Sequence, residues 1–359
     1  MKTFKNLAFL FFLLAIQEII ACTGIVIKTQ NGATITARTL EFGFDLQSNI
    51  LVIPSGNYIS FLSSGKDKVG YKMKSKYGFL GMNALDQNIV IDGVNEAGLY
   101  FGGFYFSGFA VYEKLTPSNQ ARAISSEELG NYILGSFATV DEVKVGLKNI
   151  TVVGTFIEQI SGDAPLHYAV TDRAGKSIVI EYSIAGLKIF DNTVNAITNN
   201  PTYDWHLTNL RNYVNLSADN VSGFVLDGQN YTPLSEGSGM IGLPGDTSSV
   251  SRFVRATAFV NTSLPAKDED EAIFRAFHIL NNFDIPIGLV KQKEKTSAIS
   301  EFTVWTSAVD TKNSIYYFKT YENQSVKKVD LKEMLKQANG KIMVVKAETP
   351  RTYDSLTSK

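Results

Sequence analysis

Cys22 is the only cysteine in the 359-residue chain, and it directly follows a segment with the layout of a cleavable leader. A cysteine at the first position of a processed chain carries a thiol and a free α-amino group on one carbon. The reference pKa of such an amine is about 7.7 to 8.0 and that of the thiol about 8.5, so near neutral pH the amine can accept the thiol proton without a histidine. This pairing is the N-terminal variant of the nucleophile and base that catalyse acyl transfer. The position of Cys22 therefore indicates nucleophilic cysteine chemistry.

The leader is residues 1–21, MKTFKNLAFLFFLLAIQEIIA. Lys2 and Lys5 precede an apolar run from Leu7 to Ile16, and a small residue, Ala21, ends the segment, as in secretory signal peptides. The run is shorter than the roughly 20 residues that span a bilayer. We expect cleavage after Ala21 and export to the periplasm or the medium, with residues 22–359 forming the mature domain.

A nucleophile of this kind also needs a cation that favours the thiolate, a carboxylate that orients the amine, and donors for the oxyanion. The runs TGIVIKT and ATITART flank the turn QNG, and two strand-like runs joined through Asn-Gly predict a β-hairpin. Cys22 begins the first strand of this hairpin. Arg38 and Glu41, in RTLE at the end of the second strand, are the cation and the carboxylate that the hairpin brings to it.

Eight stretches of the chain, in order, resemble one known family. They are ACTGIVIKT, ARTLEFG, DGVNEAGLYFGG, PLHYAVTD, SIVIE, ITNNPTYDWHLTNLRNY, GLPGDTSSVSRFVR and VWTSAVD. The chain resembles the choloylglycine hydrolase family of N-terminal nucleophile hydrolases, which includes penicillin V acylases and bile salt hydrolases, from Cys22 to about Phe318. The resemblance implies an enzyme that hydrolyses linear amide C-N bonds.

The resemblance also implies roles for individual residues. Cys22 matches the nucleophile and Arg38 the arginine beside the thiolate. Asn199, the first asparagine of TNNP, matches the side-chain oxyanion donor, and Arg252 of SRF matches a second arginine of the site. Tyr105 matches the position whose backbone N–H completes the oxyanion hole.

Glu41 departs from the family pattern, because this position usually holds the aspartate that binds the α-amino group. The extra methylene keeps the charge but moves the carboxylate by about a bond length. Asp45, in EFGFD, is the alternative residue for this role.

The expected fold is a single α+β domain, the four-layer αββα sandwich of antiparallel sheets found in N-terminal nucleophile hydrolases. The chain has strand patterns at its start, helical patterns in its middle and strands again at its end, which indicates antiparallel sheets with helices packed outside. The predicted helices are near residues 125–137, 139–149, 204–213, 250–261 and 269–281. The resemblance, and not the periodicity, supplies the order of the layers.

The substrate is expected to be a small amide with an apolar acyl group, because the aromatic run Tyr100 to Tyr112 suits an apolar pocket. Tyrosine at position 105 leans toward penicillin V acylases, where bile salt hydrolases tend to have asparagine. Bile salt conjugates, phenoxyacetyl penicillin and N-acyl homoserine lactones all remain candidates. Relatives are often tetramers, so a homo-tetramer is the assembly that the resemblance implies.

Several other classes of function are disfavoured. A net charge of −1 and the lack of a basic cluster argue against nucleic acid as a partner. The three histidines, at positions 167, 206 and 278, have no metal-ligand spacing, so we expect them to be structural and predict no metal and no cofactor.

One alternative stays open at this point. IIAC also resembles a bacterial lipobox, in which the cysteine is lipidated at sulfur and acylated at nitrogen. That modification of Cys22 would consume both catalytic groups and make the protein an exported, membrane-anchored lipoprotein with a binding role.

Overall fold

The chain from Cys22 onward begins with a β-hairpin, as the Asn-Gly signal predicts. The computed structural model describes residues 21–62, 70–291, 300–353 and 355. Strand β1 (Cys22–Lys28) pairs antiparallel with β2 (Thr34–Phe42), and Cys22 lies opposite Leu40. The turn closes through Gly32, whose φ of +83° suits glycine. The hairpin thus brings the end of β2 beside Cys22.

This hairpin lies within the first of two large antiparallel sheets. The strand order is β14-β1-β2-β18-β19-β20, with β17 paired to β18. The additional strands are β14 (Ala196–Ile197), β17 (Val290–Lys291), β18 (Ser300–Asp310), β19 (Ile315–Thr320) and β20 (Lys327–Asp330). Segments from the start, the middle and the end of the chain therefore meet around Cys22.

The second sheet has the order β13-β12-β11-β8-β7-β6-β3-β21. Its strands are β3 (Ile50–Ile53), β6 (Phe79–Met82), β7 (Asp92–Asn95), β8 (Tyr100–Tyr105), β11 (Leu166–Thr171), β12 (Ser177–Ser183), β13 (Gly186–Asp191) and β21 (Met343–Val345). Its neighbours in the described residues are antiparallel throughout.

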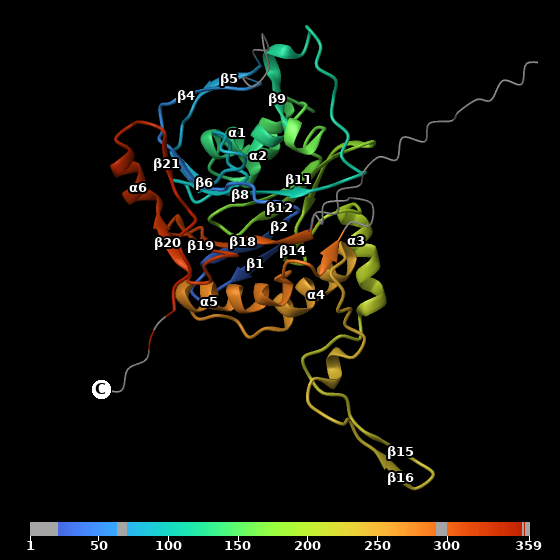
Figure 1. The fold of residues 1–359 in the computed structure, drawn as a ribbon. Coiled ribbons are helices and arrows are strands. Elements are labelled where there is room, and N and C mark those ends of the chain that lie inside the picture. Colours follow the sequence, from blue (N-terminus) through green and yellow to red (C-terminus); the bar gives the residue numbers. More distant parts are fainter. Residues whose placement is uncertain (1–20, 63–69, 292–299, 354, 356–359) are drawn as a thin grey trace, which may run out of the picture.

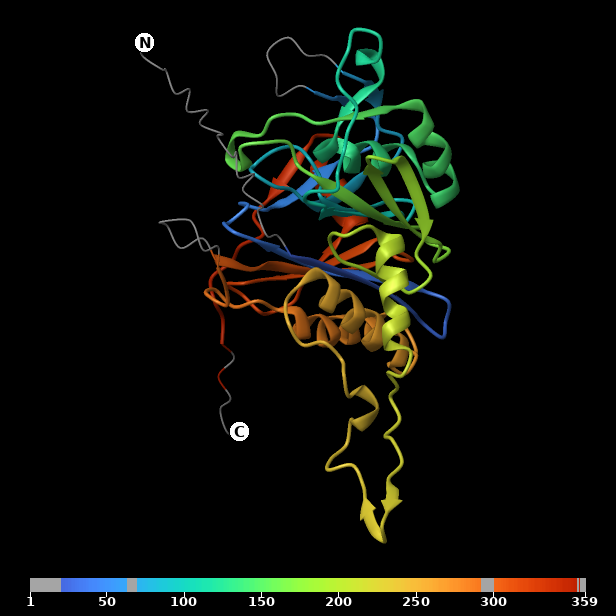
Figure 2. The same cartoon turned by 90° about the vertical axis from the view of Figure 1, so that its right-hand side faces the viewer.

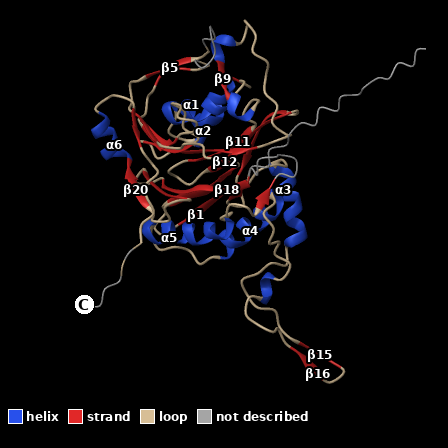
Figure 3. Ribbon diagram, viewed as in Figure 1, coloured by secondary structure: helices blue, strands red, loops and turns tan. Residues whose placement is uncertain are grey.

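Helices cover the outer face of each sheet, so the molecule has four layers (Figure 1, Figure 3). Helices α4 (Ser249–Thr262) and α5 (Glu269–Leu280) pack on the first sheet. Helices α1 (Leu129–Ser136) and α2 (Val140–Gly146) pack on the second. The predicted α+β sandwich is confirmed, and the layer order implied by the resemblance is the observed one.

Polar caps start the helices where the sequence predicts them. Ser125 and Glu128 form a reciprocal capping box in the 3₁₀ turn η2 (Ser126–Glu128), directly before α1. The side chains of Thr139, Ser248 and Asp268 accept backbone N–H groups at the starts of α2, α4 and α5. Two of these starts matter for the site, because η2 borders its cavity and α4 carries Arg252.

The interface between the sheets is close-packed and rich in aromatic side chains. Every residue of β2 and of β8 is buried, since each strand is covered on both faces. Gly24 allows this contact, because a Cβ there would lie 2.6 Å from the ring of Phe104 and 2.7 Å from Ile197. Polar residues on these strands are therefore held away from water.

A long arm, residues 214–246, leaves the sandwich beside α3 (Tyr203–Asn209) and ends in a two-stranded hairpin, β15 (Phe224–Leu226) and β16 (Gln229–Tyr231). Figure 2 shows the arm projecting far from the layers. The arm was not anticipated from the sequence, nor were β3 to β7 or helix α6 (Leu331–Ala338).

The remaining elements are short. They are β4 (Tyr58–Ser60), β5 (Lys72–Lys74), β9 (Ala123–Ser125), β10 (Thr151–Val153), and the 3₁₀ turns η1 (Gln120–Arg122), η3 (Leu147–Asn149), η4 (Glu158–Ile160), η5 (Leu210–Tyr213), η6 (Ser238–Met240) and η7 (Asn281–Phe283).

Within the part of the chain that the structure describes, no helix has the length and apolar character needed to cross a bilayer. The predicted leader, apart from Ala21, lies outside the described residues.

Candidate active site

Cys22 lies at the start of β1, in the interior between the two sheets, with 3% of its surface exposed. Its nitrogen is peptide-linked to Ala21 in this chain, and the Cys22 N–H donates a hydrogen bond to Oδ1 of Asn199 at 2.7 Å. The Ala21 carbonyl accepts the backbone N–H of Glu41 at 3.0 Å. Both groups that a processed N-terminus would use, the sulfur and the nitrogen, are thus already held beside the predicted site residues.

Asn199 follows β14 and is fixed by partners on both ends of its amide. Its Oδ1 also accepts from Nη2 of Arg252 at 2.7 Å. Its Nδ2 donates to the backbone carbonyl of Tyr105 at 2.9 Å. Two donors on the oxygen and an acceptor at the nitrogen determine the orientation of the amide. The structure therefore brings Cys22, Asn199, Tyr105 and Arg252 together, although they are distant in sequence.

Arg252 reaches the hairpin from α4. Its Nη1 donates to the carbonyl oxygen of Cys22 and, at 2.8 Å, to Oγ1 of Thr23, while its Nε donates to the Thr247 carbonyl at 2.9 Å. The guanidinium is buried and fully engaged in fixing β1 and Asn199. Its charge acts on Cys22 at short range, in an environment with little solvent screening.

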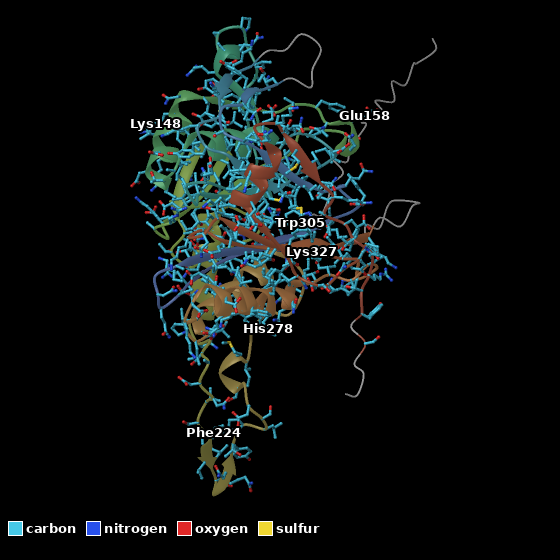
Figure 4. All side chains as sticks on the ribbon, turned by 90° about the vertical axis from the view of Figure 1, so that its left-hand side faces the viewer. Lys148, Glu158, Phe224, His278, Trp305 and Lys327 are labelled. Atoms are coloured by element: carbon cyan, nitrogen blue, oxygen red, sulfur yellow. The ribbon has the colours of Figure 1, made fainter. Side chains whose placement is uncertain are left out.

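Arg38 points into the layer between the sheets. Its guanidinium carbon lies 4.1 Å from the ring centre of Phe104 and 5.3 Å from that of Trp305, which is labelled in Figure 4. It donates to the carbonyls of Thr39 and Gly103. Its Nη2 has no hydrogen-bond partner among the described residues, so one donor of a buried cation is unused.

Glu41 is completely buried on β2, next to the residue that faces Cys22. Its Oε1 accepts from Oγ1 of Thr303 at 3.0 Å, and its Oε2 has no partner among the described residues. Burial raises the pKa of Glu41 to about 8, against the opposing effects of Arg252, Thr39, Thr303 and Arg38. A carboxyl group with an unused oxygen thus lies close enough to Cys22 for its charge to act on the thiol.

Asp45, the alternative to Glu41, is not part of this cluster. It is exposed, and its carboxylate accepts the backbone N–H of Gln47 at 2.8 Å. It lines a separate groove together with Trp305. Glu41, and not Asp45, is the carboxyl group that the structure brings to Cys22.

The thiol of Cys22 experiences opposing influences. Burial raises its pKa, and the charge of Glu41 acts in the same direction. Arg38, Arg252 and a hydrogen bond from the Tyr105 backbone lower it. The Tyr105 backbone is therefore close enough to interact with the sulfur, as expected of a group beside the reacting atoms.

Two histidines support the segment that carries Asn199, a role that the sequence did not suggest. Nε2 of His206 lies 3.0 Å from the Asn199 carbonyl, and Nε2 of His167 lies 3.0 Å from the Thr198 carbonyl. Because a carbonyl only accepts, each Nε2 carries the proton. The rings stack on Phe253 and Phe106 at 4.3 and 4.4 Å between centres. The only sequence signal for this supporting role is that both histidines lie within stretches that match the family, His206 in YDWH and His167 in PLHY.

An apolar cavity adjoins Cys22. Its walls come from β1, β2, β8, β11, the loop before β7 and the segment after η4. Phe101, Gly103 and Tyr105 contribute to the lining, as expected for the aromatic run, whereas Phe104 of the same run packs on Arg38 instead. The cavity is suited to an apolar group attached to the atom that reacts with Cys22.

The described residues contain no group of three or more His, Cys, Asp or Glu side chains that could hold a metal ion. His278, labelled in Figure 4, is on α5 in the outer helical layer, apart from the other two histidines. The polar groups around the site are the thiol and nitrogen of Cys22, the two arginines, the Glu41 carboxyl group and the amide of Asn199.

Comparisons with known proteins agree with this geometry. Residues 22–343 match the family of linear amide C-N hydrolases, choloylglycine hydrolase family. The bile salt hydrolase/transferase of Clostridium perfringens (strain 13 / Type A) is 34% identical over 313 residues, which cover 86% of this chain and 92% of the relative.

Solved structures give the same picture. A variant of the conjugated bile acid hydrolase from Clostridium perfringens has a TM-score of 0.82 at 30% identity, over 94% of this chain and 100% of that one. The penicillin V acylase from Agrobacterium tumefaciens has a TM-score of 0.68 at 26% identity, over 87% of each chain.

Proposed function

The chain belongs to the choloylglycine hydrolase family of linear amide C-N hydrolases, and on that premise we propose that Cys22 is its nucleophile once residues 1–21 have been removed. The observation that supports the proposal is that Asn199 binds the nitrogen and Arg252 the carbonyl of a buried cysteine, which lines an apolar cavity together with Glu41. The family match begins at Cys22, which agrees with this residue as the first of the mature enzyme.

The first half of the reaction forms a thioester. The thiol proton of Cys22 passes to its own α-amine while the sulfur attacks the carbonyl carbon of the amide. The negative charge that develops on the carbonyl oxygen is stabilised by Nδ2 of Asn199 and the backbone N–H of Tyr105. The C–N bond then breaks, and the ammonium of Cys22 returns the proton to the leaving amine.

The second half releases the acid. Water attacks the thioester carbon and gives a proton to the α-amine, the same two donors stabilise the oxyanion, and the C–S bond breaks. The thiolate then recovers the proton from the ammonium. One residue thus serves as nucleophile and as proton carrier in both steps.

Burial raises the pKa of the Cys22 thiol, and the two arginines oppose this effect. Arg38 and Arg252 both lower the pKa of the Cys22 thiol, which favours the thiolate that attacks. The free Oε2 of Glu41 supplies an acceptor for the α-ammonium. When Glu41 is ionised and pairs with that ammonium, the carboxylate fixes the position and the orientation of the Cys22 nitrogen.

The substrate class is an amide with an apolar acyl group, of the bile salt or penicillin V type. The higher similarity to bile acid hydrolases favours conjugated bile salts, while Tyr105 favours phenoxyacetyl penicillin. Hydrolysis of glycine and taurine conjugates of bile acids, phenoxyacetyl penicillin and N-acyl homoserine lactones by the mature enzyme decides among them. A mature enzyme that hydrolyses none of them contradicts the proposed range of substrates.

Burial of Cys22 argues against the lipoprotein alternative. A diacylglyceryl group on its sulfur would have to leave the protein interior and reach a membrane, whereas this side chain is packed between two sheets. We therefore propose export with a free N-terminal cysteine. Intact mass and N-terminal sequencing of the exported protein test this: an unmodified Cys22 at the first position supports the hydrolase, and a lipid mass supports the alternative.

Self-association through the arm is part of the proposal. The arm carries exposed large apolar side chains, and extensive exposed apolar surface is typical of protein–protein interaction sites. These side chains are Val214, Val221, Phe224, Val225, Leu226, Tyr231, Leu234 and Ile241. A homo-oligomer, expected to be a tetramer, would bury them between copies of this chain.

A further inference from the structure

The cavity beside Cys22 extends beyond the layer between the two sheets. Cys22, Phe42 and Tyr105 line it and belong to the apolar cluster between the sheets. Phe101 and Tyr168 also line it, yet they belong to the cluster under α1 and α2. The cavity therefore has lining residues from both layers, which gives an acyl group attached to Cys22 a path toward the helical layer.

Glu127 lines the cavity on this helical side. It is in the turn η2, and only 8% of its surface is exposed. Its neighbour Glu128 accepts the N–H groups of Leu62 and Ser125 and the Ser125 hydroxyl, so Glu128 serves the helix cap. The capping box uses only one of the two adjacent glutamates, so Glu127 takes no part in the helix cap.

The carboxylate of Glu127 is incompletely satisfied. Its Oε1 accepts from Oγ1 of Thr155 at 2.5 Å. Oγ of Ser126 is 3.2 Å from Oε2, but this hydroxyl has one proton and lies closer, at 2.8 Å, to the Ala164 carbonyl. No Lys, Arg or His of the described residues forms an ion pair with Glu127. Oε2 therefore has room for a further donor.

Burying a carboxylate that accepts only one short hydrogen bond costs free energy. A hydrogen bond donated by a ligand would offset part of that free energy. We infer that Glu127 is a specificity residue that accepts a hydrogen bond from a hydroxyl group at the far end of the acyl chain. The inference rests on the proposed function, since it assumes that the acyl group is bound to Cys22. An ammonium is a poorer match, because it would have to be desolvated along a largely apolar wall.

The test uses a series of N-acylglycines of increasing chain length, each made with a terminal methyl group, a terminal hydroxyl or a terminal amine. At the chain length that reaches Glu127, we expect kcat/KM for the hydroxylated substrate to exceed that for the methyl-terminated one by about 10-fold or more. An apolar pocket without such an acceptor gives the opposite order, because it penalises a buried hydroxyl.

The variant Glu127→Leu is expected to lose the preference for the hydroxyl while still hydrolysing the methyl-terminated series. Glu158→Leu is the matched control, because Glu158 is an exposed residue of η4, labelled at the periphery in Figure 4. This control is expected to keep the wild-type preference. A Glu127→Leu variant that also keeps it overturns the inference.

If Glu127→Leu does not fold, the preference of the wild-type enzyme between hydroxylated and methyl-terminated substrates tests the inference by itself. Hydrolysis of methyl-terminated chains with no hydroxyl preference at any length overturns the inference and leaves the proposed function intact. A preference for the amine-terminated series over the hydroxylated one overturns it as well. An enzyme that hydrolyses no member of the three series overturns the inference, and it contradicts the proposed function as well if it also leaves bile acid conjugates, phenoxyacetyl penicillin and N-acyl homoserine lactones intact.

Discussion

The backbone nitrogen of Cys22 and the side-chain Oδ1 of Asn199 are joined by a buried hydrogen bond of 2.7 Å, across 177 residues of sequence. The same oxygen accepts from Arg252, so its acceptor position is fixed before any processing takes place. If the Ala21–Cys22 bond is cleaved as proposed, this nitrogen becomes an α-amine that Asn199 already holds. On that proposal the fold positions the nitrogen, and cleavage supplies the base.

Cys22→Ser is expected to lower kcat/KM by about 10³-fold or more while leaving the fold unchanged. A hydroxyl is a far weaker acid and nucleophile than a thiol, so the α-amine cannot activate it comparably. Amide hydrolysis and the circular dichroism spectrum of the processed variant check this. A serine variant with wild-type activity contradicts the assignment of the nucleophile.

Asn199→Ala is expected to lower kcat by about 10²- to 10³-fold, because it removes a donor to the oxyanion and the acceptor of the amine. Steady-state kinetics on the processed variant measure it. A rise in KM with an unchanged kcat would instead assign Asn199 to ground-state binding of the substrate.

Arg38→Met is expected to raise the pKa of the Cys22 thiol, because Arg38 lowers it, and to move the acidic limb of the pH-rate profile to higher pH. Methionine fills the space between Phe104 and Trp305, so the change mainly removes charge. Thiol titration by the rate of alkylation against pH provides the measurement. An unchanged profile would mean that Arg38 serves only to pack the two sheets.

The sequence predicted the hairpin, the main helices and the cluster around Cys22, because each depends on local signals or on matched motifs. Asn31-Gly32 marks the turn, and Ser125 with Glu128 marks a helix start. Partners that depend on tertiary contacts were not predictable. Thr303 meets Glu41 from a strand 262 residues away, and His206 supports Asn199 only because α3 folds back over the preceding segment.

The arm was missed for a related reason. Its strands are three residues each and are exposed, so they lack the alternation of buried and exposed positions that identifies a strand in sequence.

Asp45 remained a candidate because sequence spacing alone did not separate it from Glu41. Only the strand register shows that Glu41 is beside Cys22 and that Asp45 is exposed in the following loop.

Glu41→Gln is expected to stabilise the unprocessed chain relative to the wild type as the pH rises from about 4.5 to about 8. With the folded-state pKa of Glu41 raised to about 8, the folded state retains a proton that the unfolded state has lost, so stability falls across this window by up to about 1.4 kcal/mol per pH unit. Urea unfolding of uncleaved protein at several pH values measures the difference. A pH-independent difference contradicts the role of burial.

In the unprocessed chain the carboxyl group of Glu41 lowers stability as the pH rises, but in the processed enzyme we expect it to support activity. The new α-ammonium needs a counter-charge there. Glu41→Gln is expected to lose most activity, whereas Glu41→Asp, which restores the residue usual in the family, is expected to keep much of it. Equal losses in the two variants would mean that the carboxylate does not hold the amine.

His206→Phe is expected to lower kcat by about 10-fold, since it removes the donor that fixes the Asn199 carbonyl but keeps the stack on Phe253. His206→Gln, which offers an amide donor near the position of Nε2, is expected to recover much of the rate. His278→Gln, at an exposed site on α5, is the control. Equal kcat for the Phe and Gln variants would contradict a positioning role.

The lowered pKa of His206 implies that the stability of the folded protein depends on pH. Burial lowers the pKa of His206 to about 4, below its usual value of about 6.5 in the unfolded chain. Between these values the unfolded state binds the proton and the folded state does not, so up to about 3 kcal/mol of stability is lost as the pH falls from 6.5 to 4. His206→Gln should remove this part of the pH dependence in urea unfolding.

The arm offers the last test. Phe224 and Leu226 are exposed on β15 at the tip of the arm, where Figure 4 labels Phe224. If apolar burial between copies drives assembly, the double change Phe224→Asp and Leu226→Asp places charges in that interface and should dissociate the oligomer, as measured by light scattering. Val145→Asp, at an exposed site on α2, controls for the added charge. Since the arm is outside the sandwich, the thermal stability of the body should change little. A double variant that keeps the wild-type mass would show that assembly, if it occurs, uses another surface.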